Sequence, residues 1–146
     1  MFTFIIKYFG FLKFIPGLAI VFDCLLKVLT FITKPTLLDW MDEIETEVLN
    51  WDGTFVSMHK YGGLQLNYSG KEIGHIHGNG LLDMLLSRDQ KKSLLQHNRI
   101  MDHHSFKNTG WISFYICTKD DAQYALELLK LSYKKMSSGN HLLITP

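Results

Sequence analysis

The sequence has little cysteine, little proline and no excess of either charge. Lys and Arg number 15 and Asp and Glu number 14, giving a formal net charge of +1 and no electrostatic footprint for nucleic acid. Nucleic-acid binding is therefore disfavoured. The two cysteines, Cys24 and Cys117, lie far apart, which supports neither a disulfide framework nor a cysteine-based zinc site. Cysteine usage consequently does not fix the compartment.

Residues 2–33 are strongly apolar and aromatic, but they lack the uncharged run of about 18 residues that a standard membrane span needs. The charges that interrupt this segment are Lys7, Lys13, Asp23 and Lys27. On a helical projection, Lys13, Asp23, Lys27 and Lys34 share one narrow sector, and the remaining perimeter is apolar. We interpret the segment as a helix, broken or kinked near Pro16, that lies in a membrane interface. The protein is therefore expected to be membrane-associated.

Three other interpretations of this segment were compared with the interfacial helix. A cleaved signal peptide is disfavoured, because the apolar region is too long and no small-residue cleavage pattern follows it. A tilted span stays open, with Lys7 and Lys34 reaching opposite headgroup layers and Asp23 deep in the bilayer. A helix that docks on the folded domain also stays open.

At 146 residues the chain has room for one domain and an appendage, and Pro35 is the clear boundary between them. We expect residues 1–34 to be a hydrophobic, membrane-associating helical segment and residues 35–146 to be the domain. Thr36 and Asp39 resemble a capping box, and the apolar positions that follow predict a helix over residues 37–50.

After this helix the apolar period changes to two, which predicts an antiparallel meander of four strands. The expected strands are 54–59, 64–68, 71–77 and 81–86. Ser87 is predicted to cap a short helix over residues 88–97. Residues 99–105 are expected to form either a fifth strand or an irregular approach to the site, and residues 111–117 another strand. Thr118 and Asp121 then open a closing helix to about Tyr133, and the tail from Ser137 is expected to be mobile until Leu142–Ile144, which could dock. The fold class is α+β, an antiparallel sheet of about four to six strands against two or three helices.

The candidate chemistry centres on His75 and His77, which are two residues apart and therefore share one face of a strand. With two-residue turns, His59 would lie opposite Leu66, and Leu66 opposite Ile73 on the same face as His75 and His77. Three histidines from two strands would then project into one space.

Asp83 depends on the length of the turn at Asn79 and Gly80. A two-residue turn places Met84 opposite His75 and points Asp83 to the other face, whereas a three-residue loop over residues 78–80 places Asp83 opposite His75. Asn-Gly favours the two-residue turn, so Asp83 is only a possible partner.

Several stretches together resemble the luciferase-domain family, which includes the fungal luciferase acting on 3-hydroxyhispidin. They are Trp51, the His59 to Gly63 stretch, the Glu72 to His77 stretch, His103 and His104, the Gly110 to Phe114 stretch and the segment ending at Tyr133. The resemblance implies oxygenation of a small apolar enolic pyrone by O2, without organic cofactor or metal, through a cyclic peroxide that loses CO2. Light emission is not decided by it.

The resemblance also implies roles for particular residues. His75 or His77 would act as the base, because histidine titrates near neutral pH, with His59 and His103 or His104 as orienting or charge-stabilising partners. The residues expected to bind substrate are Tyr61, Glu72, Trp111 and Phe114. A membrane-anchored enzyme could collect such a substrate from the bilayer.

Two further functions remain open. His75 and His77, with a third histidine or a carboxylate, could hold Zn2+ or form a facial arrangement for Fe2+. Alternatively, the chain is a non-catalytic, membrane-tethered module that binds a small apolar ligand or a partner protein, and its histidines are hydrogen-bonding core residues.

Overall fold

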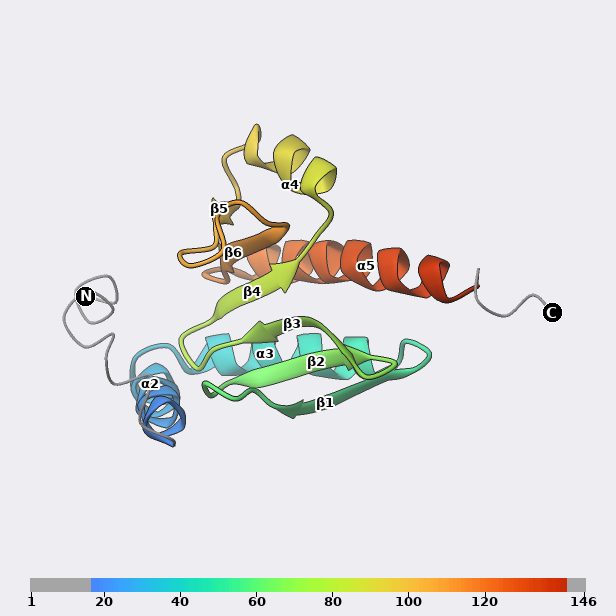
Figure 1. Cartoon of the computed structure of the whole chain (residues 1–146). Coiled ribbons are helices and arrows are strands. Elements are labelled where there is room, and N and C mark those ends of the chain that lie inside the picture. The colour runs from blue at the N-terminus through green and yellow to red at the C-terminus, as the bar shows by residue number, and fades with distance from the viewer. Residues whose placement is uncertain (1–16, 142–146) are drawn as a thin grey trace.

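The computed structural model describes residues 17–141 and has the expected α+β fold. The predicted kink near Pro16 and the predicted docking of Leu142–Ile144 lie outside these residues. The elements in chain order (Figure 1) are α2 (Leu18–Thr33), α3 (Pro35–Leu49), β1 (Thr54–Met58), β2 (Leu64–Tyr68), β3 (Lys71–Ile76), β4 (Leu81–Leu85), α4 (Arg88–Leu95), β5 (Met101–Asp102), β6 (Trp111–Tyr115) and α5 (Lys119–His141).

The strands form one six-stranded sheet in the order β1-β2-β3-β4-β6-β5, with every neighbouring pair antiparallel. The four-strand meander predicted from the alternating pattern is therefore confirmed, and β6 joins its β4 edge. The fifth strand is much shorter than predicted, because only Met101 and Asp102 pair with β6 before the chain turns away.

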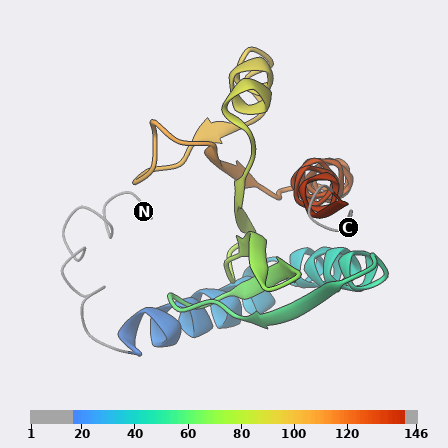
Figure 2. The same cartoon turned by 45° about the vertical axis from the view of Figure 1, so that its right-hand side comes forward.

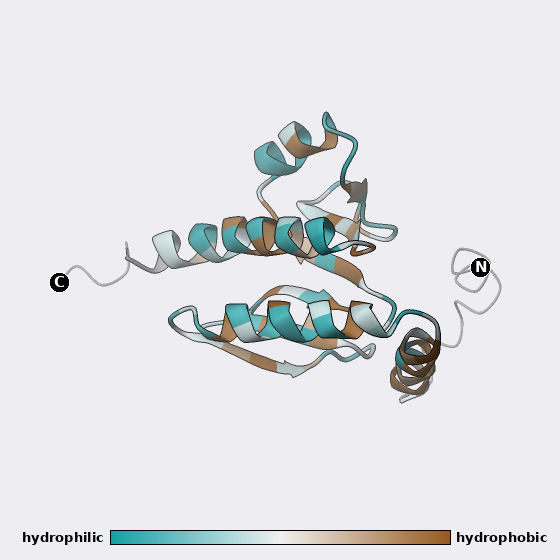
Figure 3. Cartoon of the chain, turned by 180° about the vertical axis from the view of Figure 1, so that it is seen from behind, coloured by the Kyte–Doolittle hydropathy of each residue, from teal (hydrophilic) through white to brown (hydrophobic). Residues whose placement is uncertain are grey.

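Helices α3 and α5 cover one face of the sheet, as the views from the side and from behind show (Figures 2 and 3). The core between these layers includes Ile44 of α3, Leu66 of β2, Ile76 of β3 and Leu129 of α5, none of which is exposed. Full burial of each such side chain contributes about 1.5–3 kcal/mol. This core fixes which face of each strand remains for polar residues.

Two of the three predicted helix caps are present. The Ser87 hydroxyl accepts the N–H of Gln90, and the Gln90 side chain accepts the N–H of Ser87 at the start of α4. At the start of α5 the Thr118 hydroxyl accepts the N–H of Asp121, while the Asp121 carboxylate accepts the N–H of Thr118. These reciprocal bonds satisfy donors that the first helical turn leaves unpaired.

The predicted cap at Thr36 and Asp39 is wrong, because α3 already begins at Pro35 and has no side-chain cap. Proline suits this first position, since its missing N–H would have no partner in the helix anyway. The closing helix is also longer than predicted. Residues 137–141 continue α5, so the predicted mobile tail is wrong for this part.

Helix α2 docks at the loop end of the sheet through the charged sector that includes Asp23. In a helix lying in a membrane interface this sector would face water. Asp23 is only 6% exposed, whereas Leu25 and Ile32 on the outer side are 62% and 72% exposed. The helix approaches the backbone so closely that a Cβ added to Gly78 would lie 2.8 Å from the carbonyl oxygen of Asp23. Within residues 17–141, no helix is both long and apolar enough to cross a bilayer.

Candidate functional site

A row of polar side chains crosses the sheet on the face opposite α5. Antiparallel pairing places His75 of β3 beside Asp83 of β4, and Asp83 beside Ser113 of β6. The neighbouring positions face the helices, since a Cβ added to Gly74 would lie 3.1 Å from a methyl group of Leu129 in α5. Successive strand residues point to opposite faces, so the polar row points away from α5.

A β-bulge in β3 brings Glu72 onto the same face as His75. The register of β2 against β3 shifts at Ile73, which is the extra residue, and this shift changes the alternation by one position. Ile73 is consequently fully buried in the core, and the prediction that it shares a face with His75 is wrong. The Oε1 atom of Glu72 lies 2.5 Å from Nδ1 of His75.

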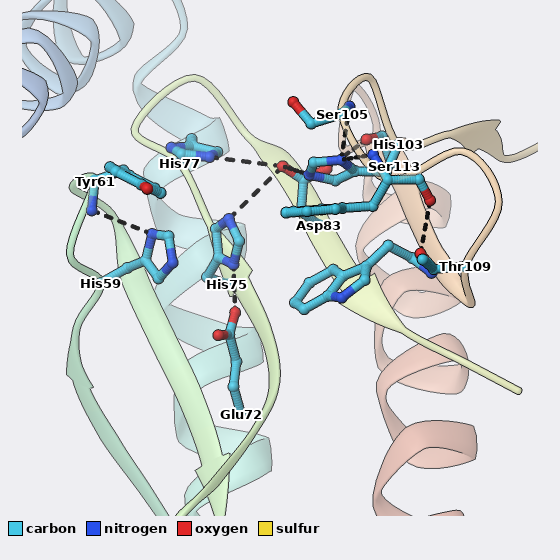
Figure 4. Close-up of polar contacts among 12 residues, drawn as sticks. His59, Tyr61, Glu72, His75, His77, Asp83, His103, Ser105, Thr109 and Ser113 are labelled. Atoms are coloured by element: carbon cyan, nitrogen blue, oxygen red, sulfur yellow. Dashed lines mark hydrogen bonds and ion pairs between the residues drawn. The ribbon is translucent and has the colours of Figure 1, made fainter. Parts of the chain in front are cut away.

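Asp83 is the centre of the cluster (Figure 4). Its Oδ2 atom faces the Nε2 atoms of three histidines, at 3.6 Å from His75, 3.7 Å from His77 and 3.6 Å from His103. Its Oδ1 atom accepts the hydroxyl hydrogen of Ser113. Burial raises the pKa of the Asp83 carboxyl, but the hydrogen bond from Ser113 and the facing imidazole of His77 outweigh it, and the pKa is lowered.

The favoured prediction that Asp83 points to the other face is wrong, because the connection between β3 and β4 is a three-residue loop. The N–H of His77 donates to the carbonyl oxygen of Leu81 at 2.9 Å, which closes this loop. The Asn79 side chain accepts the N–H of Leu81, and only Gly80 of the Asn-Gly pair has a positive φ, of 79°. A two-residue type I′ turn would need a positive φ at both positions.

His77 lies between two carboxylates from different elements. Its Nδ1 atom is 3.2 Å from Oδ1 of Asp23 in α2, and the same oxygen accepts the N–H of Gly78 at 3.0 Å. Burial lowers the pKa of His77, but the hydrogen bond with Asp23 and the facing carboxylate of Asp83 outweigh it and raise the pKa to about 9. In this arrangement His77 carries a positive charge at neutral pH.

His103 approaches Asp83 from the loop between β5 and β6. Its Nδ1 atom accepts the N–H groups of Ser105 and Phe106, at 3.1 and 3.3 Å. A neutral imidazole has one hydrogen, so these bonds assign it to Nε2, the atom that faces Asp83. Burial is the largest influence on the pKa of His103 and keeps it below the ordinary value despite the attraction of Asp83.

A buried lysine holds this loop in place. Lys91 of α4 is 5% exposed, and its Nζ atom lies 2.6 Å from a carboxylate oxygen of Asp102. The ammonium group also donates to three backbone carbonyl oxygens, those of Lys107, Thr109 and Trp111, at 2.8, 3.0 and 2.9 Å. Lys91 thus fixes both sides of the segment that carries His103.

His59 joins the cluster by a different route from the predicted one. The prediction that it lies opposite Leu66 is wrong, because Val56 occupies that position and His59 lies in the loop after β1. Its ring nevertheless stacks on His75, with 3.8 Å between ring centroids. Burial, together with the nearby charge of His75, lowers the pKa of His59 to about 4, so this ring is neutral at pH 7.

The remaining predicted site residues divide between the two faces. Trp111 is half-buried beside the cluster, with its ring centroid 6.0 Å from that of His75, and Tyr61 is 47% exposed at the opposite rim. His104 is exposed and stacks on His103 with centroids 4.4 Å apart. Phe114, by contrast, faces the helices in the core and is not near the histidines.

The family model described as Luciferase domain matches residues 70–132. Residues 70–132 belong to the luciferase-domain family. Comparisons with curated proteins and with solved structures find no match. The luciferase domain includes the Asp83 cluster and the loop that carries His103, whereas Asp23 and His59 precede it in the sequence.

Several polar residues that support the luciferase-domain cluster were not predicted from the sequence. Asp23 was placed with Lys13, Lys27 and Lys34 in one charged sector of a helix, and neither Ser113 nor Lys91 was selected. The position of Ser113 in an alternating strand was the available signal for its face. For Lys91 the helical spacing gave no signal, since Leu94 and Leu95 of the same helix are themselves only half-buried.

A separate cleft of about 420 Å³ lies between α3 and α5, on the other side of the luciferase domain's sheet. Its lining includes Glu43, Trp51, Gln123 and Lys130, but none of the clustered histidines. The chemistry therefore concentrates at the Asp83 cluster.

Proposed function

We propose that the chain is a luciferase-like oxygenase that acts on a small apolar enolic substrate of the hydroxypyrone type with O2. The observation that carries this proposal is the convergence of three histidine Nε2 atoms on the buried Oδ2 atom of Asp83. A cluster of this kind can accept the enol proton and hold the resulting enolate, which is the electron-rich form that O2 attacks. The family match supports the reaction class.

The proposed reaction needs no separate reductant. The enolate supplies the electrons that reduce O2, both oxygen atoms form bonds to substrate carbon, and the cyclic peroxide then breaks with loss of CO2. The contribution of the cluster is to ionise the enol and keep the ring in place while O2 adds. Glu72 fixes the orientation of His75 through Nδ1, which directs Nε2 toward the reacting group.

Exposed apolar side chains beside the cluster suit an apolar substrate. Tyr61 lies at one rim, and Met101 and Phe106 lie at the other, with exposed fractions of 47%, 45% and 51%. Phe106 stacks on His103, and the Trp111 ring lies near both Phe106 and His75. Aromatic walls around a few polar groups are the usual make-up of a small-molecule site.

Replacement of His75 by alanine is expected to abolish oxygen uptake with hydroxypyrones. The change removes the ring that stacks on His59 and the contact with Glu72, so the cluster loses the imidazole proposed to accept the enol proton. An oxygen electrode and a panel of hydroxypyrones measure the rate, and a luminometer records light from the same reactions. His97→Ala is the matched control, because His97 is exposed at the end of α4. Equal uptake by His75→Ala and the unaltered chain would refute the proposal.

We further propose that residues 2–33 attach residues 35–146 to a membrane, from which the apolar substrate is collected. Support comes from the outer face of α2, where Val21, Leu25, Val28 and Ile32 are all more than half exposed. Lys27 and Lys34 are exposed on the same helix and at its end, where they can reach lipid headgroups.

Ile32→Glu is expected to lower binding to phosphatidylcholine vesicles about tenfold, since the apolar contact of one buried isoleucine contributes about 1.5–3 kcal/mol. Flotation of the full chain at limiting lipid measures the bound fraction. Leu49→Glu is the control, because Leu49 is 44% exposed on α3 rather than on α2. Unchanged flotation of Ile32→Glu would exclude this face of α2 from the membrane contact.

A further inference from the structure

We infer that His75, His77 and Asp83 bind one divalent first-row transition-metal ion. One ligand atom from each of these residues lies within 4.8 Å of the other two. Two histidines and one carboxylate that leave further positions open form the facial ligand set of non-haem Fe(II) oxygenases. In the observed hairpin register the Asp83 carboxylate faces the histidines, whereas the register favoured from the sequence pointed it away from them.

The separations within the cluster suit a shared ion better than direct hydrogen bonds. Oδ2 of Asp83 is 3.6 Å from Nε2 of His75 and 3.7 Å from Nε2 of His77. A hydrogen bond between nitrogen and oxygen has a length of about 2.7–3.2 Å. Two ligand atoms that each lie about 2.0–2.1 Å from a metal ion are about 3 Å apart in an octahedral facial set and about 3.4 Å apart in a tetrahedral set. Small side-chain movements therefore complete the coordination.

Each proposed histidine ligand has a carboxylate on its other ring nitrogen. Glu72 contacts Nδ1 of His75, and Asp23 contacts Nδ1 of His77. Metal binding would displace the hydrogen that His77 carries on Nε2, and with each Nδ1 hydrogen directed to its carboxylate, each Nε2 would then present a lone pair to the same space near Asp83. Carboxylate–histidine–metal chains of this kind orient ligands and increase their basicity.

The charges around the two rings also favour a cation. Glu72, Asp23 and Asp83 place three carboxylates against His75 and His77. All three carboxylates are largely removed from solvent, with side-chain exposures of 23%, 9% and 1%. A divalent ion compensates this negative charge at the point where the Nε2 and Oδ2 atoms meet.

His59 and His103 also lie within reach of a shared ion together with neighbouring groups, but their ring nitrogens are less suited to it. Nδ1 of His103 accepts two backbone N–H groups, so its Nε2 carries hydrogen and donates toward Asp83. Nδ1 of His59 likewise faces a backbone N–H, that of Tyr61 at 3.4 Å. His75 and His77, whose Nδ1 atoms face carboxylates, are therefore the better ligands.

This inference deepens the proposed function and rests on it for the role of the ion. The ion would bind the enolate oxygen, whereas the family resemblance implied a reaction without metal. Metal binding itself can be measured without turnover.

The test is a titration of the full chain, stripped of metal by a chelator, with CoCl2, followed by visible ligand-field absorption and isothermal calorimetry. One Co2+ per chain is expected. His77→Gln and Asp83→Asn should bind at least tenfold more weakly, and Asp23→Asn about 10–100-fold more weakly. His97→Gln, at an exposed histidine after α4, should retain the affinity of the unaltered chain. Circular dichroism checks that each variant is folded. If a ligand variant does not fold, Asp23→Asn still tests the site, because it leaves all three ligands in place.

Absence of saturable binding at one ion per chain would overturn the inference, as would equal affinities of His77→Gln and His97→Gln. Oxygen uptake separates this outcome from failure of the proposed function. Full uptake by the metal-stripped chain, together with no saturable Co2+ binding, refutes the metal site and retains the oxygenase. Saturable Co2+ binding without uptake of oxygen, with Fe2+ and every hydroxypyrone supplied, retains the site and refutes the oxygenase.

Discussion

Asp83→Asn is expected to lower the rate of oxygen uptake by about 10²–10³-fold, the usual loss on removal of one preorganised electrostatic group from an active site. Asparagine has nearly the same size and can still accept the Ser113 hydroxyl, so the shape of the cluster is conserved. It lacks the charge that faces the Nε2 atoms of three histidines. Initial rates at saturating hydroxypyrone measure the loss.

The matched control is Asp42→Asn, since Asp42 is an exposed aspartate of α3 on the other side of the sheet. Its rate should equal that of the unaltered chain. Thermal unfolding of both variants shows whether a slower rate reflects lost structure. A folded Asp83→Asn protein with an undiminished rate would remove Asp83 from the active site.

The strands were predictable because local residues decide them. The run from Leu64 to Tyr68 is bounded by Gly62-Gly63 and Ser69-Gly70 and forms β2 with the predicted bounds. The turn that follows has positive φ at both Ser69 and Gly70, 47° and 79°, as a two-residue hairpin requires. At this turn the sequence pattern and the structure agree.

The register near the site was not predictable from turn residues, because contacts distant in sequence decide it. The loop before β4 packs against α2, and the carboxylate of Asp23 accepts the N–H of Gly78. This bond favours a three-residue loop over the two-residue turn that Asn79 and Gly80 suggested. The bulge at Ile73 likewise interrupts the strict alternation of side chains along β3, and it buries the Ile73 side chain in the core.

Which site residues could be predicted also depends on whether the contacts that place them are local or distant in sequence. His75 and His77 stand out because two imidazoles at this spacing share a strand face. His59 was predicted to lie with them and does so, although the strand register used for that prediction was wrong. Asp23 could not be found, since its partner His77 lies 54 residues away and helical periodicity alone assigned it to a solvent-facing sector. Tertiary docking of α2 reverses that assignment.

Lys91→Met is expected to destabilise the protein by about 2–4 kcal/mol, since it leaves three carbonyl acceptors and one carboxylate without their buried cation. The lower part of this range allows for Asp102, which is half exposed and regains water when the ammonium is lost. Methionine nearly preserves the volume of the lysine stem, so the loss measures the polar contacts rather than a cavity. Urea denaturation followed by circular dichroism gives the free energy of unfolding.

Lys92→Met is the matched control, because the neighbouring Lys92 is exposed on the same helix and its replacement should change stability by less than about 0.5 kcal/mol. Lys91→Met should also slow oxygen uptake at temperatures where it is folded, because the carbonyls that Lys91 holds belong to the loop that carries His103 toward Asp83. Equal stability of the two variants would mean that water replaces the ammonium group without cost. Reduced stability with a normal rate would instead show that the position of His103 does not depend on Lys91.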